Sequence, residues 1–313
     1  MRCTAPRTVG FRPDGKTLSW SQKTYSKEFA TFPLPCGKCL ECRLEYARQW
    51  AIRCVHEAQM HPQNAFITLT YSDEHLPGPK LVYEDFQKFM KRLRFTYPNN
   101  QIGCFVTGEY GDKTKRPHWH AILFGWTPND ATHKYTNDRG DRVFSSVSLD
   151  KVWGLGITEF GSVTFESAGY CARYAAKKLS HGHDNDHEWH PISKKSSKHA
   201  IGKKWLEKNW PDAFSYGQII LRKGEKTIKC SIPRYYEKWL KKNQPDAWAL
   251  YVTQTKEDQM QKSALRAAAE SQQDLLTNHP RRLKQKPHVR TRTEASAIIL
   301  REKFKLLQAQ QKL

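Results

Sequence analysis

The sequence has no run of about 18 apolar residues, so we expect no membrane-spanning helix. Its first residues lack the apolar segment of a secretory signal, which argues against the disulfide-rich secreted proteins. Acidic residues are scarce: 31 Asp and Glu stand against 52 Lys and Arg, giving a net charge of +21. This surplus favours an anionic partner, and without a membrane segment we expect that partner to be nucleic acid.

The eight cysteines, in a chain without a secretory signal, indicate reduced thiols in a cytoplasm. Cys36, Cys39 and Cys42 form a Cys-x2-Cys-x2-Cys run just before a predicted helix over residues 43–59. This spacing is tighter than in most zinc sites, and the fourth ligand must come from elsewhere, with Cys54 or His56 as candidates. One hypothesis is a structural Zn²⁺ site with Cys54 as fourth ligand, and the alternative is unmetallated thiols around a turn that caps the helix.

Residues 10–17 formally match the phosphate-binding pattern G-x-x-x-x-G-K-[ST], which requires a strand before it and a helix after it. Here Pro13-Asp14-Gly15 is a turn signal, and residues 18–21 alternate like a strand. We therefore predict a β-hairpin, and not a nucleotide site.

The middle of the chain predicts strand, helix, strand, strand. Residues 65–71 are β-branched and alternating, and residues 102–109 form a second strand. Between them, residues 83–95 carry an apolar stripe at helical spacing, which we assign to core packing. The members of the stripe are Phe86, Phe89, Met90 and Leu93.

The strand expected over residues 116–124 places His118 and His120 on the same face. In a symmetric hairpin with the preceding strand, Glu109 lies opposite His118 and Thr107 opposite His120, about 5 Å apart. Two imidazoles and one carboxylate would form a metal site with open positions for a substrate. A His-x-His pair alone is more often structural.

Residues 167–179 predict a helix with Ser167 as its N-cap. Tyr170 and Tyr174 are four residues apart and share one face, Lys177 falls on the same face, and Lys178 lies close by. The alternative is two half-buried tyrosines that only pack the helix.

The remaining chain is polar and basic. Residues 181–190 form a His-rich tract, predicted as a solvated loop with metal binding as the alternative. Residues 195–245 interleave basic and aromatic side chains, which suits single-stranded nucleic acid but also a small helical subdomain. The Arg43, Arg48 and Arg53 face of the first helix is either solvated or contacts DNA.

Two further helices are expected, over residues 249–276 and 294–307, joined by a basic linker. The predicted segments are an N-terminal Cys-containing part (1–60), a catalytic part (61–185), a basic and aromatic part (186–248) and a helical basic tail (249–313).

These parts together support phosphodiester transesterification. A divalent cation polarises the scissile phosphate, and a tyrosine hydroxyl attacks in line to leave a 5′-phosphotyrosine and a free 3′-OH. A nearby lysine, Lys177 or Lys178, offsets the developing negative charge. A second tyrosine one helical turn away allows a further attack while the first still holds DNA.

The ordered motifs resemble those of HUH endonucleases in their two-tyrosine form. The motifs are Phe66-Ile67-Thr68-Leu69-Thr70-Tyr71, Glu109, His118-Trp119-His120 and Tyr170-x3-Tyr174-x2-Lys177-Lys178. The run Pro35-Cys36-Gly37-Lys38-Cys39 is similar to the N-terminal pattern of gokushovirus replication initiators. The resemblance covers roughly residues 35–180.

The resemblance implies an α+β fold with a five-stranded antiparallel sheet and flanking helices, followed here by a helical basic C-terminal region. It also implies Mg²⁺ or Mn²⁺ at Glu109, His118 and His120, and a rolling-circle nick at a phage origin in single-stranded or supercoiled DNA. The place of action would be the host bacterial cytoplasm, with a host helicase and polymerase as partners.

Three rival functions remain open: a two-tyrosine HUH transposase, a non-catalytic single-stranded DNA-binding protein, and a two-His-one-carboxylate iron oxygenase. The oxygenase leaves the charge and the paired tyrosines unexplained. Metal-dependent cleavage would exclude the DNA-binding protein. The sequence does not fix the oligomeric state.

Overall fold

In the computed structural model, the described residues are 3–111, 114–138, 140–177, 192–196, 200–223, 226–277 and 290–310. The chain divides into two compact units. One comprises Met1–Glu41, Asp212–Ile219 and Tyr235–Leu313, and the other comprises Cys42–Pro211 and Ile220–Arg234. The four segments expected from the sequence stay a prediction.

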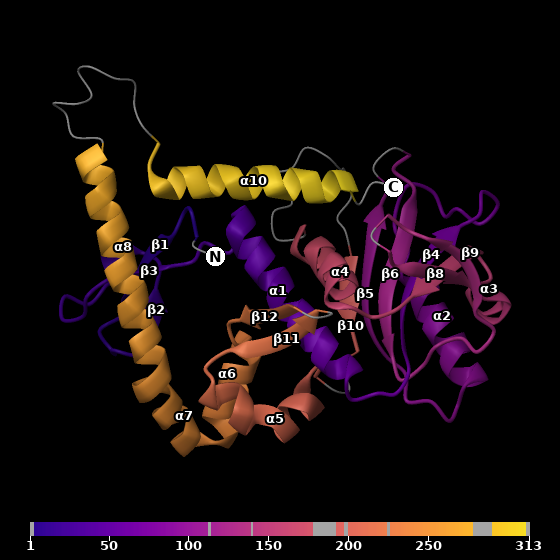
Figure 1. The fold of residues 1–313 in the computed structure, drawn as a ribbon, viewed down its shortest axis with the longest axis horizontal. Coiled ribbons are helices and arrows are strands. Elements are labelled where there is room, and N and C mark those ends of the chain that lie inside the picture. The colour runs from indigo at the N-terminus through magenta and orange to yellow at the C-terminus, as the bar shows by residue number, and fades with distance from the viewer. Residues whose placement is uncertain are drawn as a thin grey trace. The chain divides into compact units, whose positions relative to one another are not determined.

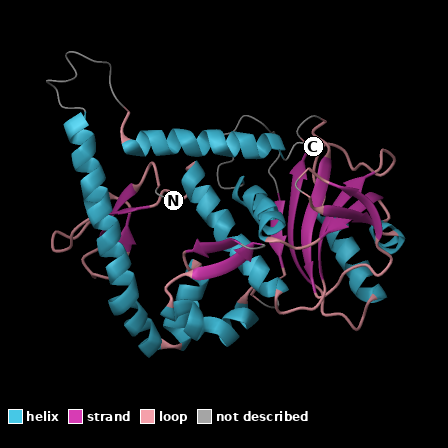
Figure 2. Cartoon of the chain, in the orientation of Figure 1, coloured by secondary structure: helices cyan, strands magenta, loops and turns pink. Residues whose placement is uncertain are grey.

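The larger unit is built on one antiparallel sheet of seven strands (Figures 1 and 2). These strands are β4 (Asn64–Tyr71), β5 (Gly103–Tyr110), β6 (Pro117–Phe124), β7 (Thr132–Thr136), β8 (Arg142–Ser145), β9 (Gly156–Gly161) and β10 (Ile192–Lys195). Their order across the sheet is β10-β5-β6-β4-β9-β8-β7. The predicted α+β class is confirmed, but the sheet has seven strands and not five.

The two additional strands, β7 and β8, come from a connection whose sequence carries no strand signal. Every residue of β7 is exposed, and β8 has no fully buried residue. A strand without a buried face lacks the alternation by which strands are recognised in a sequence. Pairing with the neighbouring strand defines them instead, since β7 pairs with β8 and β8 continues onto β9 through Phe144 and Phe160.

Helices cover both faces of this sheet. On one face, α2 (Tyr83–Thr96) and α3 (Val147–Trp153) pack over a core that includes Trp119. The predicted stripe of α2 is confirmed, because its four members are all buried there. On the other face, α4 (Phe165–Lys177) and α1 (Leu40–Ala58, of which Cys42 onward belongs to this unit) pack on Phe105, Ile122 and Phe124.

The register of β5 and β6 is the one expected for a symmetric hairpin. Glu109 pairs with His118, and Thr107 pairs with His120. On the other side of β6, Thr68 of β4 pairs with His120. Because side chains alternate along a strand, both histidines lie on the α4 face while Trp119 is buried among α2 and α3.

The smaller unit begins with a three-stranded sheet in the order β2-β1-β3. Its strands are β1 (Arg7–Phe11), β2 (Leu18–Ser19) and β3 (Phe32–Leu34). The predicted hairpin is confirmed, since Gly10 pairs with Ser19 around the turn at Asp14. Residues 10–17 therefore form a turn between strands and not a phosphate-binding loop.

The other elements of the chain are mostly helical. They are α5 (Lys203–Ser215), the paired strands β11 (Ile219–Lys223) and β12 (Lys226–Cys230), α6 (Arg234–Asn243), α7 (Pro245–Tyr251), a π-helical turn (Val252–Lys256), α8 (Glu257–Thr277) and α10 (Arg292–Gln310). The helices predicted over residues 249–276 and 294–307 correspond to α7 through α8 and to α10.

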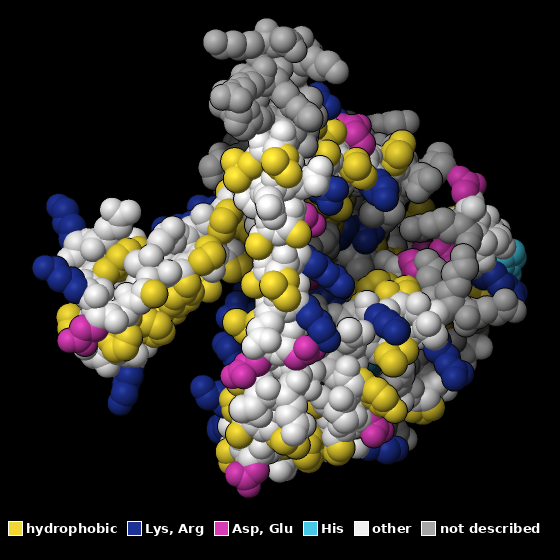
Figure 3. Space-filling model, turned by 60° about the vertical axis from the view of Figure 1, so that its left-hand side comes forward, with side chains coloured by type: hydrophobic (Ala, Val, Ile, Leu, Met, Phe, Trp, Pro, Cys, Tyr) yellow, Lys and Arg dark blue, Asp and Glu magenta, His cyan; other side chains and the backbone are white. Residues whose placement is uncertain are grey.

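Among the described residues, none of the helices has the length and apolar character needed to span a membrane. In the view of Figure 3, lysine and arginine side chains are spread over the described surface, consistent with the positive net charge.

Candidate metal centre and nucleophile

Glu109, His118 and His120 bring their side chains together on the α4 face of the sheet. One ligand atom from each lies within 4.8 Å of the other two. Glu109 Oε1 is 2.9 Å from His118 Nε2 and 2.8 Å from His120 Nε2. Glu109 is 4% exposed and His120 is 7% exposed, so water competes little for these atoms. The arrangement is that of three ligands facing one point.

The hydrogen bonds on the far side of each ring determine which nitrogen faces Glu109 as a lone pair. His118 Nδ1 lies 3.1 Å from the carbonyl oxygen of Arg116, which can only accept, so Nδ1 carries the proton. His120 Nδ1 lies 3.0 Å from Thr68 Oγ1, which can accept in the same way. In their neutral forms both rings then turn a lone pair toward a carboxylate. Lone pairs that converge on a carboxylate favour a cation between them.

The charge state of the three side chains fits this view. Burial would raise the pKa of the Glu109 carboxyl, but the charge and hydrogen bonds of His120 and His118 lower it to about 2. Burial lowers the pKa of His120, which favours its neutral, metal-binding form. Within the described part of the chain, no donor reaches the buried Glu109 Oε2, so a ligand position stays available.

Tyr170 lies at the same point. Its hydroxyl donates to Glu109 Oε1 at 2.8 Å and is 3.4 Å from His120 Nε2. Its ring meets that of His120 edge-on, with centroids 4.9 Å apart. Helix α4 positions this side chain from above the sheet. An alcohol oxygen next to three convergent ligands is placed as a nucleophile that a bound metal could reach.

Helix α4 begins at Phe165, two residues earlier than expected, because Thr164 and not Ser167 is its N-cap. The amide of Ser167 donates to Thr164 Oγ1 at 3.1 Å, and the amide of Thr164 donates to Ser167 Oγ at 2.8 Å. This is the reciprocal pattern of a capping box, with serine in the place of the usual acidic residue. It fixes the start of the helix about one and a half turns before Tyr170.

Three supporting residues are not apparent from single motifs. Thr68 holds His120 through its ring nitrogen, and Phe66 stacks on His120 with centroids 5.8 Å apart and an interplanar angle of 4°. Arg173 places its guanidinium carbon 6.0 Å from the Tyr170 ring. Strand alternation could have revealed Phe66 and Thr68, since both share the histidine face once β4 is paired with β6.

The other residues of the predicted tyrosine motif are only partly described. Tyr174 and Lys177 belong to the helical backbone of α4, but their side chains lie outside the described residues. Lys178 and the His-rich tract 181–190 also lie outside them. Their roles stay predictions.

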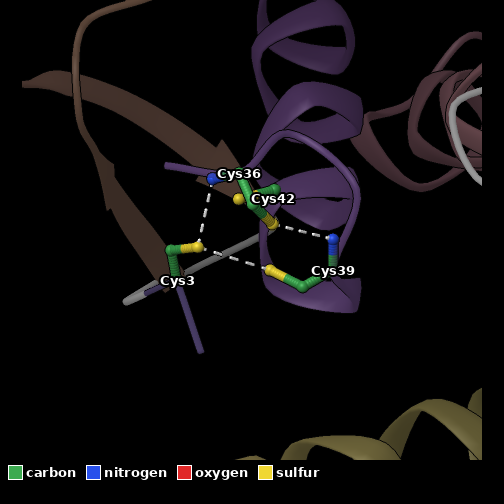
Figure 4. A group of neighbouring side chains, drawn as sticks. All are labelled: Cys3, Cys36, Cys39 and Cys42. Carbon is green, nitrogen blue, oxygen red and sulfur yellow. Dashed lines mark hydrogen bonds between the residues drawn. The ribbon is translucent and has the colours of Figure 1, made fainter. Parts of the chain in front are cut away.

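The cysteine run forms a second group of ligands, with one change from the expectation. The fourth cysteine is Cys3 and not Cys54: the thiols of Cys3, Cys36, Cys39 and Cys42 lie within 4.8 Å of one another (Figure 4). Cys54 is instead fully buried in the core between α1 and α4, where burial raises its pKa far above the usual value.

The Cys36 thiol lies in a more polar setting. Burial would raise its pKa, but the amides of Cys39 and Lys38 and the neighbouring thiols lower it to about 7. His56, the other candidate fourth ligand, stacks on Trp205 with centroids 3.5 Å apart.

Two arginines of the predicted basic face of α1 have internal partners. Arg48 pairs with Glu45 and donates to the Ser231 carbonyl at 3.0 Å. Arg53 is 9% exposed, donates to the Ile201 carbonyl at 3.0 Å and lies 4.1 Å from the centre of the Trp50 ring. These two side chains hold the fold of the larger unit.

Comparisons with known proteins agree with this organisation. The family model for replication-associated proteins of the ORF2 type matches residues 64–179. The chain is 44% identical to the replication-associated protein VP4 of Bdellovibrio phage phiMH2K, over the whole length of both. It is 31% identical to the replication-associated protein ORF2 of Spiroplasma virus 4, covering 65% of this chain and 66% of that one. It is 33% identical to the replication-associated protein ORF4 of Chlamydia phage 1, covering 67% and 54%. No solved structure matches the chain.

Proposed function

This chain belongs to the family of phage replication-associated proteins, and from that premise we propose that it is a replication initiation endonuclease that cuts DNA with Tyr170. The observation that carries the proposal is the position of the Tyr170 hydroxyl, 2.8 Å from Glu109 Oε1 and 3.4 Å from His120 Nε2. A tyrosine that only packed a helix would not need to reach three convergent metal ligands.

Glu109, His118 and His120 would hold the divalent cation, for which we propose Mg²⁺ or Mn²⁺. The fit rests on the converging lone pairs of the two histidines and on Glu109 Oε2, which no described donor satisfies. When bound, the cation supplies Lewis-acid polarisation of the scissile phosphate.

The chain's own residues account for the remaining chemistry. Tyr170 Oη forms a bond to phosphorus, the bond between phosphorus and O3′ breaks, and DNA stays on the enzyme through a 5′-phosphotyrosine. The proton that leaves the tyrosine, held by Glu109 at the outset, is balanced by the proton that O3′ gains. Arg173, beside the Tyr170 ring, supplies positive charge near the phosphate. The covalent bond keeps the energy needed for religation.

The second tyrosine of the motif extends this scheme to repeated cycles. Tyr174 follows Tyr170 by one turn of α4, and we propose that it attacks the regenerated junction while Tyr170 still carries DNA. The proposed substrate is single-stranded or supercoiled DNA at a phage replication origin, with a host helicase and polymerase extending the nick. The phage relatives favour replication over the transposase alternative.

The test is a cleavage reaction on labelled single-stranded origin DNA with Mg²⁺ or Mn²⁺, analysed on a denaturing protein gel. We expect a covalent protein–DNA band that is lost with a chelator and in the Tyr170→Phe/Tyr174→Phe double variant. DNA binding without any adduct, in both metals and on several origin fragments, would overturn the proposal in favour of a DNA-binding protein.

A further inference from the structure

Four cysteines gather where the chain enters its first helix. Cys3 precedes β1, Cys36 and Cys39 lie in the loop after β3, and Cys42 lies in the first turn of α1. All four are half-buried free thiols, and their sulfurs lie within 4.8 Å of one another (Figure 4). The phosphodiester chemistry proposed above uses none of them.

The spacing of the sulfurs fits one tetrahedral ion. With zinc–sulfur bonds of about 2.3 Å, the sulfurs of a tetrahedral site lie about 3.8 Å apart. Cys3 Sγ and Cys39 Sγ are 3.7 Å apart. A disulfide would bring two sulfurs to about 2.05 Å. A four-iron cluster would spread the four sulfurs farther, because its iron and sulfide atoms lie between them.

The loop that carries Cys36 and Cys39 is shaped to support negatively charged sulfur. The amides of Lys38 and Cys39 point at Cys36 Sγ, at 3.4 Å and 3.3 Å, and the amide of Cys36 points at Cys3 Sγ at 3.3 Å. Gly37 permits this turn with φ of +76°, a backbone conformation that a side chain would strain. Amide donors aimed at sulfur stabilise thiolates, the form in which cysteine binds metal.

Strand pairing explains why Cys3 completes the group. In the antiparallel pair of β1 and β3, Arg7 pairs with Leu34 and Thr8 with Pro33. Continuing this register beyond the strand ends brings residue 3 opposite residue 38, between Cys36 and Cys39. The position of Cys3 therefore follows from the fold of the N-terminal sheet.

This sheet also has little else to hold it. Among residues 3–35, only Val9, Gly10 and Ser19 are buried. A segment that buries so few apolar side chains gains little from the hydrophobic effect and commonly needs a metal or a disulfide.

We propose that Cys3, Cys36, Cys39 and Cys42 bind one Zn²⁺ as a structural tetrathiolate site. The ion fastens the start of the chain to the loop after β3 and to the first turn of α1. The site is independent of the proposed nuclease activity, and its test needs no DNA.

The first experiment measures the metal in the full-length protein, purified under reducing conditions without chelator. We expect one zinc ion per chain by elemental analysis, and release of that zinc as an organomercurial titrates the thiols. Replacement by Co²⁺ should give the visible absorption of a tetrahedral thiolate site. A protein without zinc that also gives no such Co²⁺ spectrum would overturn the proposal.

Matched variants identify the ligands. Cys3→Ala should lose the zinc and expose the N-terminal segment to protease, whereas Cys54→Ala, on α1 but outside the group, should keep one zinc per chain. Zinc retained in Cys3→Ala and lost in Cys54→Ala would overturn the assignment. If Cys3→Ala does not fold, removing zinc from the unmodified chain with a chelator should expose the same segment to protease, and unchanged protection would contradict the structural role.

Discussion

The hydroxyl of Tyr170 donates a hydrogen bond to Glu109 Oε1 across 2.8 Å, although 61 residues separate the two in the chain. One residue comes from a helix and the other from the second strand of the sheet order. Their meeting beside His118 and His120 joins a potential nucleophile to a potential metal site. Each prediction below tests a part of this arrangement or of the fold that creates it.

The metal ligands should be essential for cleavage and dispensable for DNA binding. Replacing His118 or His120 by Ala removes a ligand, and we expect cleavage to fall by at least about 100-fold, since a bound cation contributes several kcal/mol to the transition state. Titration calorimetry with Mn²⁺ should show the lost metal affinity. His75→Ala, at an exposed histidine outside the site, should behave like the unmodified protein. Full cleavage by His120→Ala would refute the metal assignment.

Thr68 should act by orienting His120. Thr68→Val keeps the shape of the strand but removes the partner of His120 Nδ1 at 3.0 Å, and we expect Mn²⁺ affinity to fall by about 10- to 100-fold. Thr107→Val is the matched control, because Thr107 lies on the other side of His120 and donates instead to the Ile192 carbonyl at 3.2 Å. An equal loss in both variants would mean that general packing, and not the hydrogen bond, is responsible.

Gly108 should be required for packing directly behind the site. A Cβ at this position would lie 2.6 Å from Trp119 Cζ3 and 2.9 Å from Leu81 Cδ2. We expect Gly108→Ala to lower the free energy of unfolding by about 1–3 kcal/mol in urea denaturation. At Gly103, on the same strand, the nearest atom would be at 3.6 Å, so Gly103→Ala should change stability much less.

Stability should fall in acid partly because of His56. This side chain is 1% exposed, and burial lowers its pKa to about 3. The unfolded chain takes up the proton near pH 6.5, so folding loses stability as the pH falls from about 6.5 toward 3, by up to about 1.4 kcal/mol per pH unit. Above pH 6.5 the residue contributes no pH dependence.

His56→Phe keeps a ring against Trp205 and should reduce this slope in urea titrations between pH 6.5 and 4.5. The variant can be less stable overall, but the readout is the slope. An unchanged slope, equal to that of His75→Phe at an exposed position, would show that His56 does not titrate as described.

The sequence specified the centre of the sheet well, because its signals are local. The stripe of α2, the alternation of β4 and the hairpin that pairs Glu109 with His118 all follow from residues close together in the chain. Patterns over a few residues decide those features. The metal-ligand geometry could be expected for the same reason.

The remaining features depend on long-range pairing. The place of Cys3 follows from the register of β1 with β3, and β10 joins β5 through only Ile192–Lys195. Neither is visible in a local pattern, since a short polar strand has no buried face to mark it. The contact of Tyr170 with Glu109 likewise needed the packing of α4 on the sheet.

The most direct test of the central claim is to find which residue carries the DNA. The adduct formed by the Tyr174→Phe variant with Mn²⁺ would be digested with protease and nuclease, and its peptides analysed by mass spectrometry. The account predicts a nucleotide attached through phosphate to Tyr170. A nucleotide on any other residue of this variant, or efficient cleavage that leaves no covalent adduct, would contradict it.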